Sequence, residues 1–92
     1  MPSYLVETFL ARGDRGAILS RERRARSAAK ELTHGATHVR FARSIHVPED
    51  EICFFVFDAP SGREAALAAQ RAGLEPARIV EAVLSTEQAG CS

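Results

Sequence analysis

The side chains capable of acid–base or metal chemistry are few, and most lie in segments with strand-like patterns. The three histidines are His34, His38 and His46, and the sequence has no His-x-His, Cys-x-x-Cys or His-Glu-x-x-His motif. On one regular strand, His38 and His46 would point the same way, about 27 Å apart at about 3.4 Å per residue. They cannot chelate one metal ion within one chain. The simplest interpretation is that each histidine is solvated or hydrogen-bonded at a sheet edge. The alternative is that it pairs with a residue of another strand or of a second copy.

Glu7 lies in the middle of an apolar segment, where an unpaired carboxylate is costly. We expect it to pair with Arg40, Arg43 or a histidine in a salt bridge at a dimer interface, or to serve as the acid of a pocket or as a metal ligand. Glu81 raises the same question, less strongly, in the last apolar segment. Carboxylates held in such surroundings often have the shifted pKa values that general acids and bases need.

The arginine-rich segment 21–26 resembles a nucleic-acid patch, but a helix would spread its charges around the circumference, diluted by Glu22 and Glu31. The chain has 12 basic and 12 acidic residues, so its total charge favours neither nucleic acid nor an anionic membrane. We therefore interpret this segment as a solvated helix face and expect no nucleic-acid or membrane partner.

The cysteine content predicts a reducing, cytoplasmic setting. The sequence has two cysteines, too few for a disulfide scaffold. Cys53 lies in the most apolar segment and is expected to be a small core residue with an inert thiol. We expect no signal peptide, and no apolar segment approaches the length of about 20 residues that a membrane span needs.

Six segments with helix-like or strand-like periodicity must position these side chains. Asp14 and Ser61 are predicted helix caps, with Glu64 completing a capping box, and Gly35 and Gly73 are predicted helix ends. The predicted order is strand 4–10, helix 17–33, strand 38–47, strand 52–57, helix 61–72 and strand 78–84. Residues 1–84 should form one domain, followed by a flexible tail over 85–92.

The β-α-β-β-α-β order predicts an α+β, ferredoxin-like fold, a four-stranded antiparallel sheet with two helices on one face. We expect the first and third strands in the centre, parallel to each other, and the other two at the edges. The third strand, 52–57, is apolar at every position, as expected when both faces are covered. Because two helices cover one face only, a second copy with its sheet facing the first is the simplest cover for the other. A ligand or the tail is the alternative.

Several short motifs, in a fixed order, resemble a known family. They lie at residues 4–7, 43–51, 57–61, 71–74 and 79–83. Together they resemble a bacterial family of small uncharacterised ferredoxin-like domains whose best-known branch is a nickel-binding protein. The resemblance implies a homodimer of the dimeric α+β barrel kind, with a metal or small ligand at the dimer face. That branch has a histidine pair in its first strand, where this chain has Glu7-Thr8-Phe9, and His38 is the counterpart of a second-strand histidine.

The expected function is therefore that of a non-enzymatic homodimer. It would bind a metal ion, with nickel as the candidate, or a small ligand at the sheet face. The predicted ligand pocket comprises Glu7, Arg40, Phe55 and Glu81, and the predicted metal ligands are His38 and His46. The alternative is a small cofactor-free enzyme of the dimeric α+β barrel type, an isomerase or monooxygenase, with Glu7 or a histidine as proton shuttle.

Overall fold

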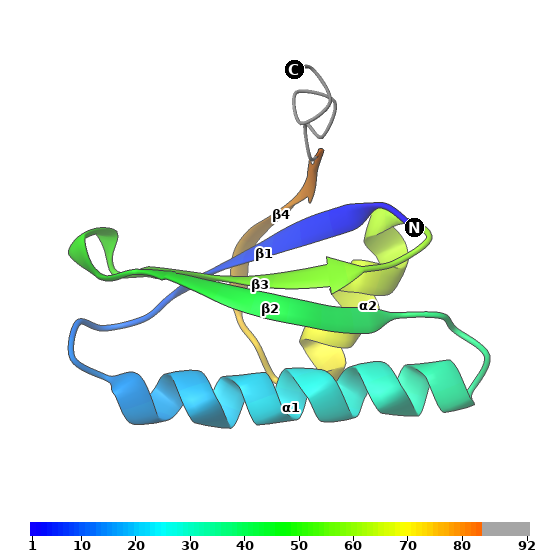
Figure 1. The fold of residues 1–92 in the computed structure, drawn as a ribbon, viewed down its shortest axis with the longest axis horizontal. Coiled ribbons are helices and arrows are strands. Elements are labelled where there is room, and N and C mark those ends of the chain that lie inside the picture. Colours follow the sequence, from blue (N-terminus) through cyan, green and yellow to red (C-terminus); the bar gives the residue numbers. More distant parts are fainter. Residues whose placement is uncertain (84–92) are drawn as a thin grey trace, which may run out of the picture.

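The computed structural model describes residues 1–83 and has the β-α-β-β-α-β order that the sequence predicts (Figure 1). The elements are β1 (Ser3–Phe9), α1 (Arg15–His34), β2 (Arg40–Val47), β3 (Ile52–Asp58), α2 (Gly62–Arg71) and β4 (Pro76–Ala82), with a short 3-10 turn, η1 (Pro48–Asp50), between β2 and β3. Neither helix is long and apolar enough to cross a membrane. The predicted tail over 85–92 and the predicted end of the last strand at residue 84 lie outside the described residues.

The sheet has the strand order β2-β3-β1-β4, and every neighbouring pair is antiparallel. The prediction that β1 and β3 are central is confirmed. The prediction that they run parallel is wrong. The turn between β2 and β3 reverses the chain, so β3 opposes both of its neighbours, and the crossover through α1 leaves β1 and β2 running the same way on either side of it.

The predicted helix caps are confirmed. The Asp14 carboxylate accepts a hydrogen bond from the Ala17 N–H at 3.4 Å, and the Ser61 hydroxyl accepts one from the Arg63 N–H at 3.3 Å while it donates to Glu64. Helix α1 ends at Gly35. After α2 the chain turns at Gly73, whose φ of 76° lies in the region that favours glycine. These local signals explain why the element boundaries follow the sequence closely.

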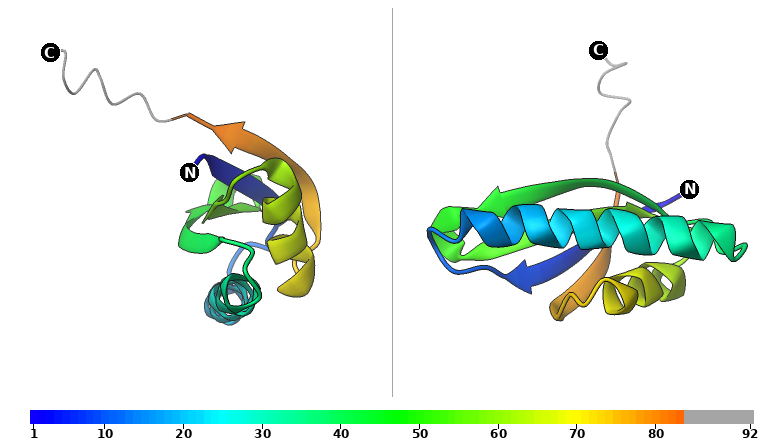
Figure 2. Two further views of the ribbon diagram at one scale, coloured as in Figure 1. Left: turned by 90° about the vertical axis from the view of Figure 1, so that its right-hand side faces the viewer. Right: turned by 90° about the horizontal axis from the view of Figure 1, so that it is seen from below.

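Both helices pack on one face of the curved sheet (Figure 2). Small residues line their inner sides. The side chains that β1 and β3 turn toward them include Val6, Cys53, Phe55 and Phe57, all fully buried. Alanine keeps the helix backbones close to the sheet, and the domain measures 38 × 36 × 19 Å. The buried alanines are Ala25, Ala28 and Ala29 of α1 and Ala65, Ala68 and Ala69 of α2.

A β-bulge in β2 changes which residues face the helices. The register against β3 shifts between Phe41 and Arg43, so the regular alternation predicted over 38–47 is wrong. Phe41 lies on the helix side, with its ring centroid 5.6 Å from that of Phe57. Beyond the bulge, Ser44 and His46 face the helices. Arg43, Ile45 and Val47, which alternate with Ser44 and His46, face away from the helices.

Candidate functional site

The side of the sheet away from the helices, here named the open face, carries exposed apolar side chains. Phe9, Ile45 and Val80 are 64%, 44% and 37% exposed. In the strand register Leu5 lies opposite both Val56 and Val80, so the apolar residues run across three strands. An apolar surface of this continuity is typical of an interface. The open face consists of Ser3, Leu5, Glu7, Phe9, Arg40, Arg43, Ile45, Val47, Ile52, Phe54, Val56, Asp58, Arg78, Val80 and Ala82.

Glu7 lies on the open face and is paired, but its partner differs from the prediction. Arg78 of β4 donates a hydrogen bond from Nε to the Glu7 carboxylate at 2.9 Å. The register places Arg78 directly opposite Glu7, whereas Arg40 and Arg43 lie on β2, on the far side of β3. Glu7 is therefore one half of a cross-strand ion pair.

Asp58 is the second carboxylate of the open face and the more strongly held. It accepts hydrogen bonds from the Ser3 hydroxyl at 2.6 Å and from Arg40 at 2.6 and 3.1 Å. Burial raises the pKa of Asp58, but the hydrogen bonds from Ser3 and Arg40 and the charge of Arg40 outweigh it, so the pKa lies below its ordinary value. The carboxylate stays ionised and fixes Arg40 at this end of the face.

A hollow of about 290 Å³ lies at the same end of the open face. Arg40 and Arg43 from β2 line it together with Leu5 and Val56. Arg43 makes no ion pair with any residue in the described part of the chain. The other lining residues are Met1, Ser3, Ala42, Ile45, Asp58 and Ala82.

The four residues of the predicted ligand pocket do not meet within one copy. Glu7 and Arg40 share the open face, but each is paired with a different residue. Phe55 is fully buried under the helices, on the opposite side of the sheet. Glu81 lies on the edge strand β4, exposed, and opposite Tyr4 in the register, so it belongs to the helix side. The sequence reasoning placed Phe55 wrongly because an all-apolar strand does not reveal which residues point to which face.

The predicted metal ligands do not meet either. His38 precedes β2 and is exposed, and His46 faces the helices, so the two do not share a regular strand. The Nε2 atom of His46 is buried and has no hydrogen-bond partner among the described residues. Within residues 1–83 no group of three or more histidine, cysteine or carboxylate side chains is placed to hold a metal ion.

Cys53 is a buried core residue, as predicted. It is fully buried and lies opposite His46 in the register of β2 and β3. Burial raises the pKa of the Cys53 thiol, although the charge of Arg21 opposes this and that of Glu22 adds to it. The thiol is therefore protonated and unreactive at neutral pH.

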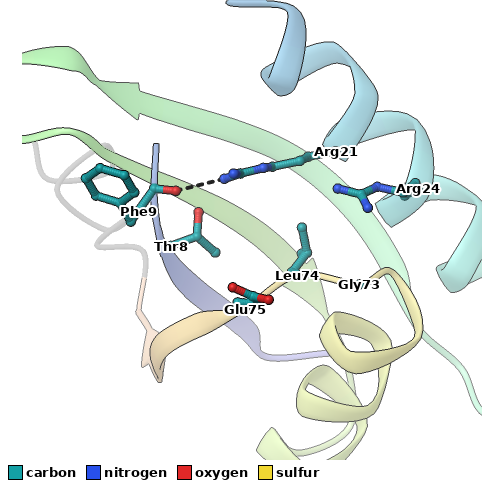
Figure 3. Close-up of a pocket in the computed structure, with 7 residues that line it drawn as sticks. All are labelled: Thr8, Phe9, Arg21, Arg24, Gly73, Leu74 and Glu75. Atoms are coloured by element: carbon teal, nitrogen blue, oxygen red, sulfur yellow. Dashed lines mark hydrogen bonds between the residues drawn. The ribbon is translucent and has the colours of Figure 1, made fainter. Parts of the chain in front are cut away.

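A second hollow, here named the arginine pocket, lies between α1 and the connection from α2 to β4 (Figure 3). It has a volume of about 300 Å³ and is lined by Thr8, Phe9, Arg21, Arg24, Gly73, Leu74 and Glu75. The sequence reasoning treated segment 21–26 as a solvated helix face and missed this pocket. The spacing of Arg21 and Arg24, three residues apart, was the available signal, because such residues share one helix face.

None of the known protein families and none of the curated proteins matches this sequence. Among solved structures, the chain is similar to SCO4226 from Streptomyces coelicolor A3(2), known from a crystal structure. The TM-score is 0.67 at 19% sequence identity, over 90% of this chain and 98% of that one. A likeness at this identity establishes the fold alone. The fold class is thus the predicted one, an α+β domain of ferredoxin-like topology.

Proposed function

We propose that this protein is a non-enzymatic homodimer in which two open faces meet and enclose a small ligand. The observation that carries the proposal is the open face itself. Its apolar side chains, Ile45 and Val80 among them, are exposed on a sheet whose other face packs against both helices. A second sheet of the same kind would remove them from water, in the arrangement of a dimeric α+β barrel.

The charges of the open face support a second copy as the partner. A two-fold interface uses the same surface on both copies, so ion pairs across it require both signs of charge on that surface. The open face has three arginines and two carboxylates, and Arg43 alone of the three arginines lacks an ion pair within the described residues. Arg43 is therefore free to meet a carboxylate of the second copy or of a ligand.

The hollow at one end of the open face is the proposed ligand site. A facing sheet would close it over the apolar surface of Leu5 and Val56 and beside the guanidinium of Arg43. These surroundings suit a small molecule with an apolar body and an anionic group. We favour a small molecule over nickel, because residues 1–83 of one copy place no three histidine, cysteine or carboxylate side chains together to hold a metal ion.

Two further observations support the proposal. Glu7 and Asp58 are each held by an arginine, which suits a binding role better than that of a free catalytic base. The proposal includes a cytoplasmic location, which the free, buried Cys53 thiol supports.

The first experiment measures the oligomeric state by sedimentation velocity for the full chain and two variants. Ile45→Glu places a charge on the open face, and Leu19→Glu makes the same change on α1, where the side chain is 63% exposed. We expect the wild type and Leu19→Glu to be dimers and Ile45→Glu to be a folded monomer by circular dichroism. A monomeric wild type, or a dimeric Ile45→Glu, would overturn the proposed dimer.

The second experiment tests the ligand site with 8-anilinonaphthalene-1-sulfonate, an apolar anion whose fluorescence rises on binding. We expect saturable binding to the wild type and a weaker affinity in Arg43→Gln by about tenfold, the loss expected for a charged hydrogen bond. Arg63→Gln, an equal charge change at the start of α2, should bind like the wild type. Equal affinities in the three proteins would exclude Arg43 from the ligand site.

A further inference from the structure

Two arginines of α1 converge on the arginine pocket, on the helix side of the sheet. Arg21 and Arg24 extend from neighbouring turns toward the end of β1 and the connection after α2 (Figure 3). Neither forms an ion pair within residues 1–83. Two guanidinium groups beside one hollow, without carboxylate partners, repel each other unless an anion or solvent lies between them.

Arg21 is held in place by the backbone. Its Nη1 atom donates a hydrogen bond to the carbonyl oxygen of Phe9, the last residue of β1, at 2.9 Å. A guanidinium has five N–H donors, so most of them stay available. Because this hydrogen bond already fixes the side chain, binding an anion would cost little further side-chain ordering.

Gly73 leaves room for Arg24. A side chain at position 73 would place its Cβ only 3.3 Å from Nη1 of Arg24, and the φ of 76° independently favours glycine there. The guanidinium of Arg24 therefore lies against the backbone of the α2–β4 connection. The Thr8 hydroxyl, also in the pocket, is already used, since it donates to the Cys53 carbonyl at 2.8 Å.

We propose that the arginine pocket binds the oxyanion group of a small molecule, a carboxylate or a phosphate. The planar donors of Arg21 and Arg24 match the oxygens of both groups, and such charge-assisted hydrogen bonds are the strongest that side chains form. Glu75 lines the same pocket from the α2–β4 connection, so its carboxylate weakens the binding of any anion. The site lies on the helix side of the sheet, shares only Phe9 with the open face and needs no second copy.

The test is a titration of the full chain, labelled with nitrogen-15, followed by amide chemical shifts. Sodium phosphate and sodium acetate are added in separate series, with sodium chloride keeping the ionic strength constant. We expect saturable shifts at Phe9, Arg24 and Leu74. Saturation with phosphate alone identifies a phosphate site, and saturation with acetate identifies a site for which a carboxylate is sufficient.

Three variants make the test specific. Arg24→Gln should weaken binding about tenfold, the effect of losing a charged hydrogen bond. Arg23→Gln removes the same charge from the same helix but does not line the pocket, so its affinity should match that of the wild type. Glu75→Gln should strengthen binding severalfold. The proposal fails if neither anion gives saturable shifts, if the two arginine variants weaken binding equally, or if Glu75→Gln weakens it.

Discussion

The two faces of the sheet come from alternate residues of the same four strands, yet they differ in what covers them. On the helix side, Val6, Phe55 and Phe57 are fully buried. On the open face, two of the apolar residues, Phe9 and Ile45, are 64% and 44% exposed. Both faces are apolar enough to form a core, but within residues 1–83 the chain supplies cover for only one of them.

The difference teaches that the two faces hold their polar groups in different ways. The helix side carries the packed core and holds the buried Thr8 hydroxyl in a hydrogen bond, although the buried Nε2 atom of His46 has no partner among the described residues. The open face instead carries ion pairs at positions open to solvent, where a partner or ligand can reach them. Substitutions on the helix side should act on folding, and substitutions on the open face should act on association.

The largest expected effect comes from neighbouring phenylalanines on opposite faces. Phe55→Ala leaves a cavity in the core and should lower the free energy of unfolding by about 3–5 kcal/mol. Phe54→Ala, on the open face where the side chain is half-buried, should lower it by about 1 kcal/mol in a single copy. Urea unfolding at several protein concentrations measures both, and only the Phe54→Ala effect should depend on concentration. Equal losses would contradict the division between the faces.

An intermediate effect is expected at Asp58. Its pKa is lower in the folded chain than the ordinary value of 3.8, so the carboxylate stabilises the fold above that pH, and the contribution is lost as the pH falls through the folded pKa. Asp58→Asn should lower the free energy of unfolding by about 1 kcal/mol at neutral pH. Thermal unfolding across the acid range should show the wild type and Asp58→Asn converging below about pH 4. A constant difference down to the lowest pH would show that the ionisation of Asp58 is not its cause.

The smallest effect is expected at Glu7. In the Ile45→Glu background, where the open face stays uncovered, Glu7→Gln should lower the free energy of unfolding by about 0.5 kcal/mol. This is the contribution typical of an exposed ion pair. This difference should vanish in about 1 M salt, where charges are screened. In the wild type the cost should be larger, because a facing sheet would exclude water from the pair. Equal costs in both backgrounds would place Glu7 outside the interface.

The element order was predictable because its signals are local. The caps at Asp14 and Ser61 and the stops at Gly35 and Gly73 each depend on a few neighbouring residues, and all four are confirmed. The stripe of buried alanines on α1 follows from helical spacing in the same way. The prediction that β1 and β3 run parallel was wrong because it left out the chain reversal at the turn between β2 and β3.

The candidate sites were less predictable because they depend on register between distant segments. The partner of Glu7 is Arg78, a residue of the last strand that only strand pairing brings opposite it. The bulge after Phe41 leaves no mark in the sequence, yet it decides that Arg43 joins the open face. The arginine pocket requires α1 and the turn at Gly73 to meet, which helical spacing alone does not show.

The layered build of the domain gives the association a hydrodynamic signature. Both helices lie on one side of the sheet, so stacking two copies sheet to sheet would place the two sheets in the middle of one compact particle (Figure 2). Pairing through the edge strands would instead produce a long plate. A face-to-face dimer should therefore sediment faster, and scatter X-rays with a smaller radius of gyration, than an edge-to-edge dimer of equal mass.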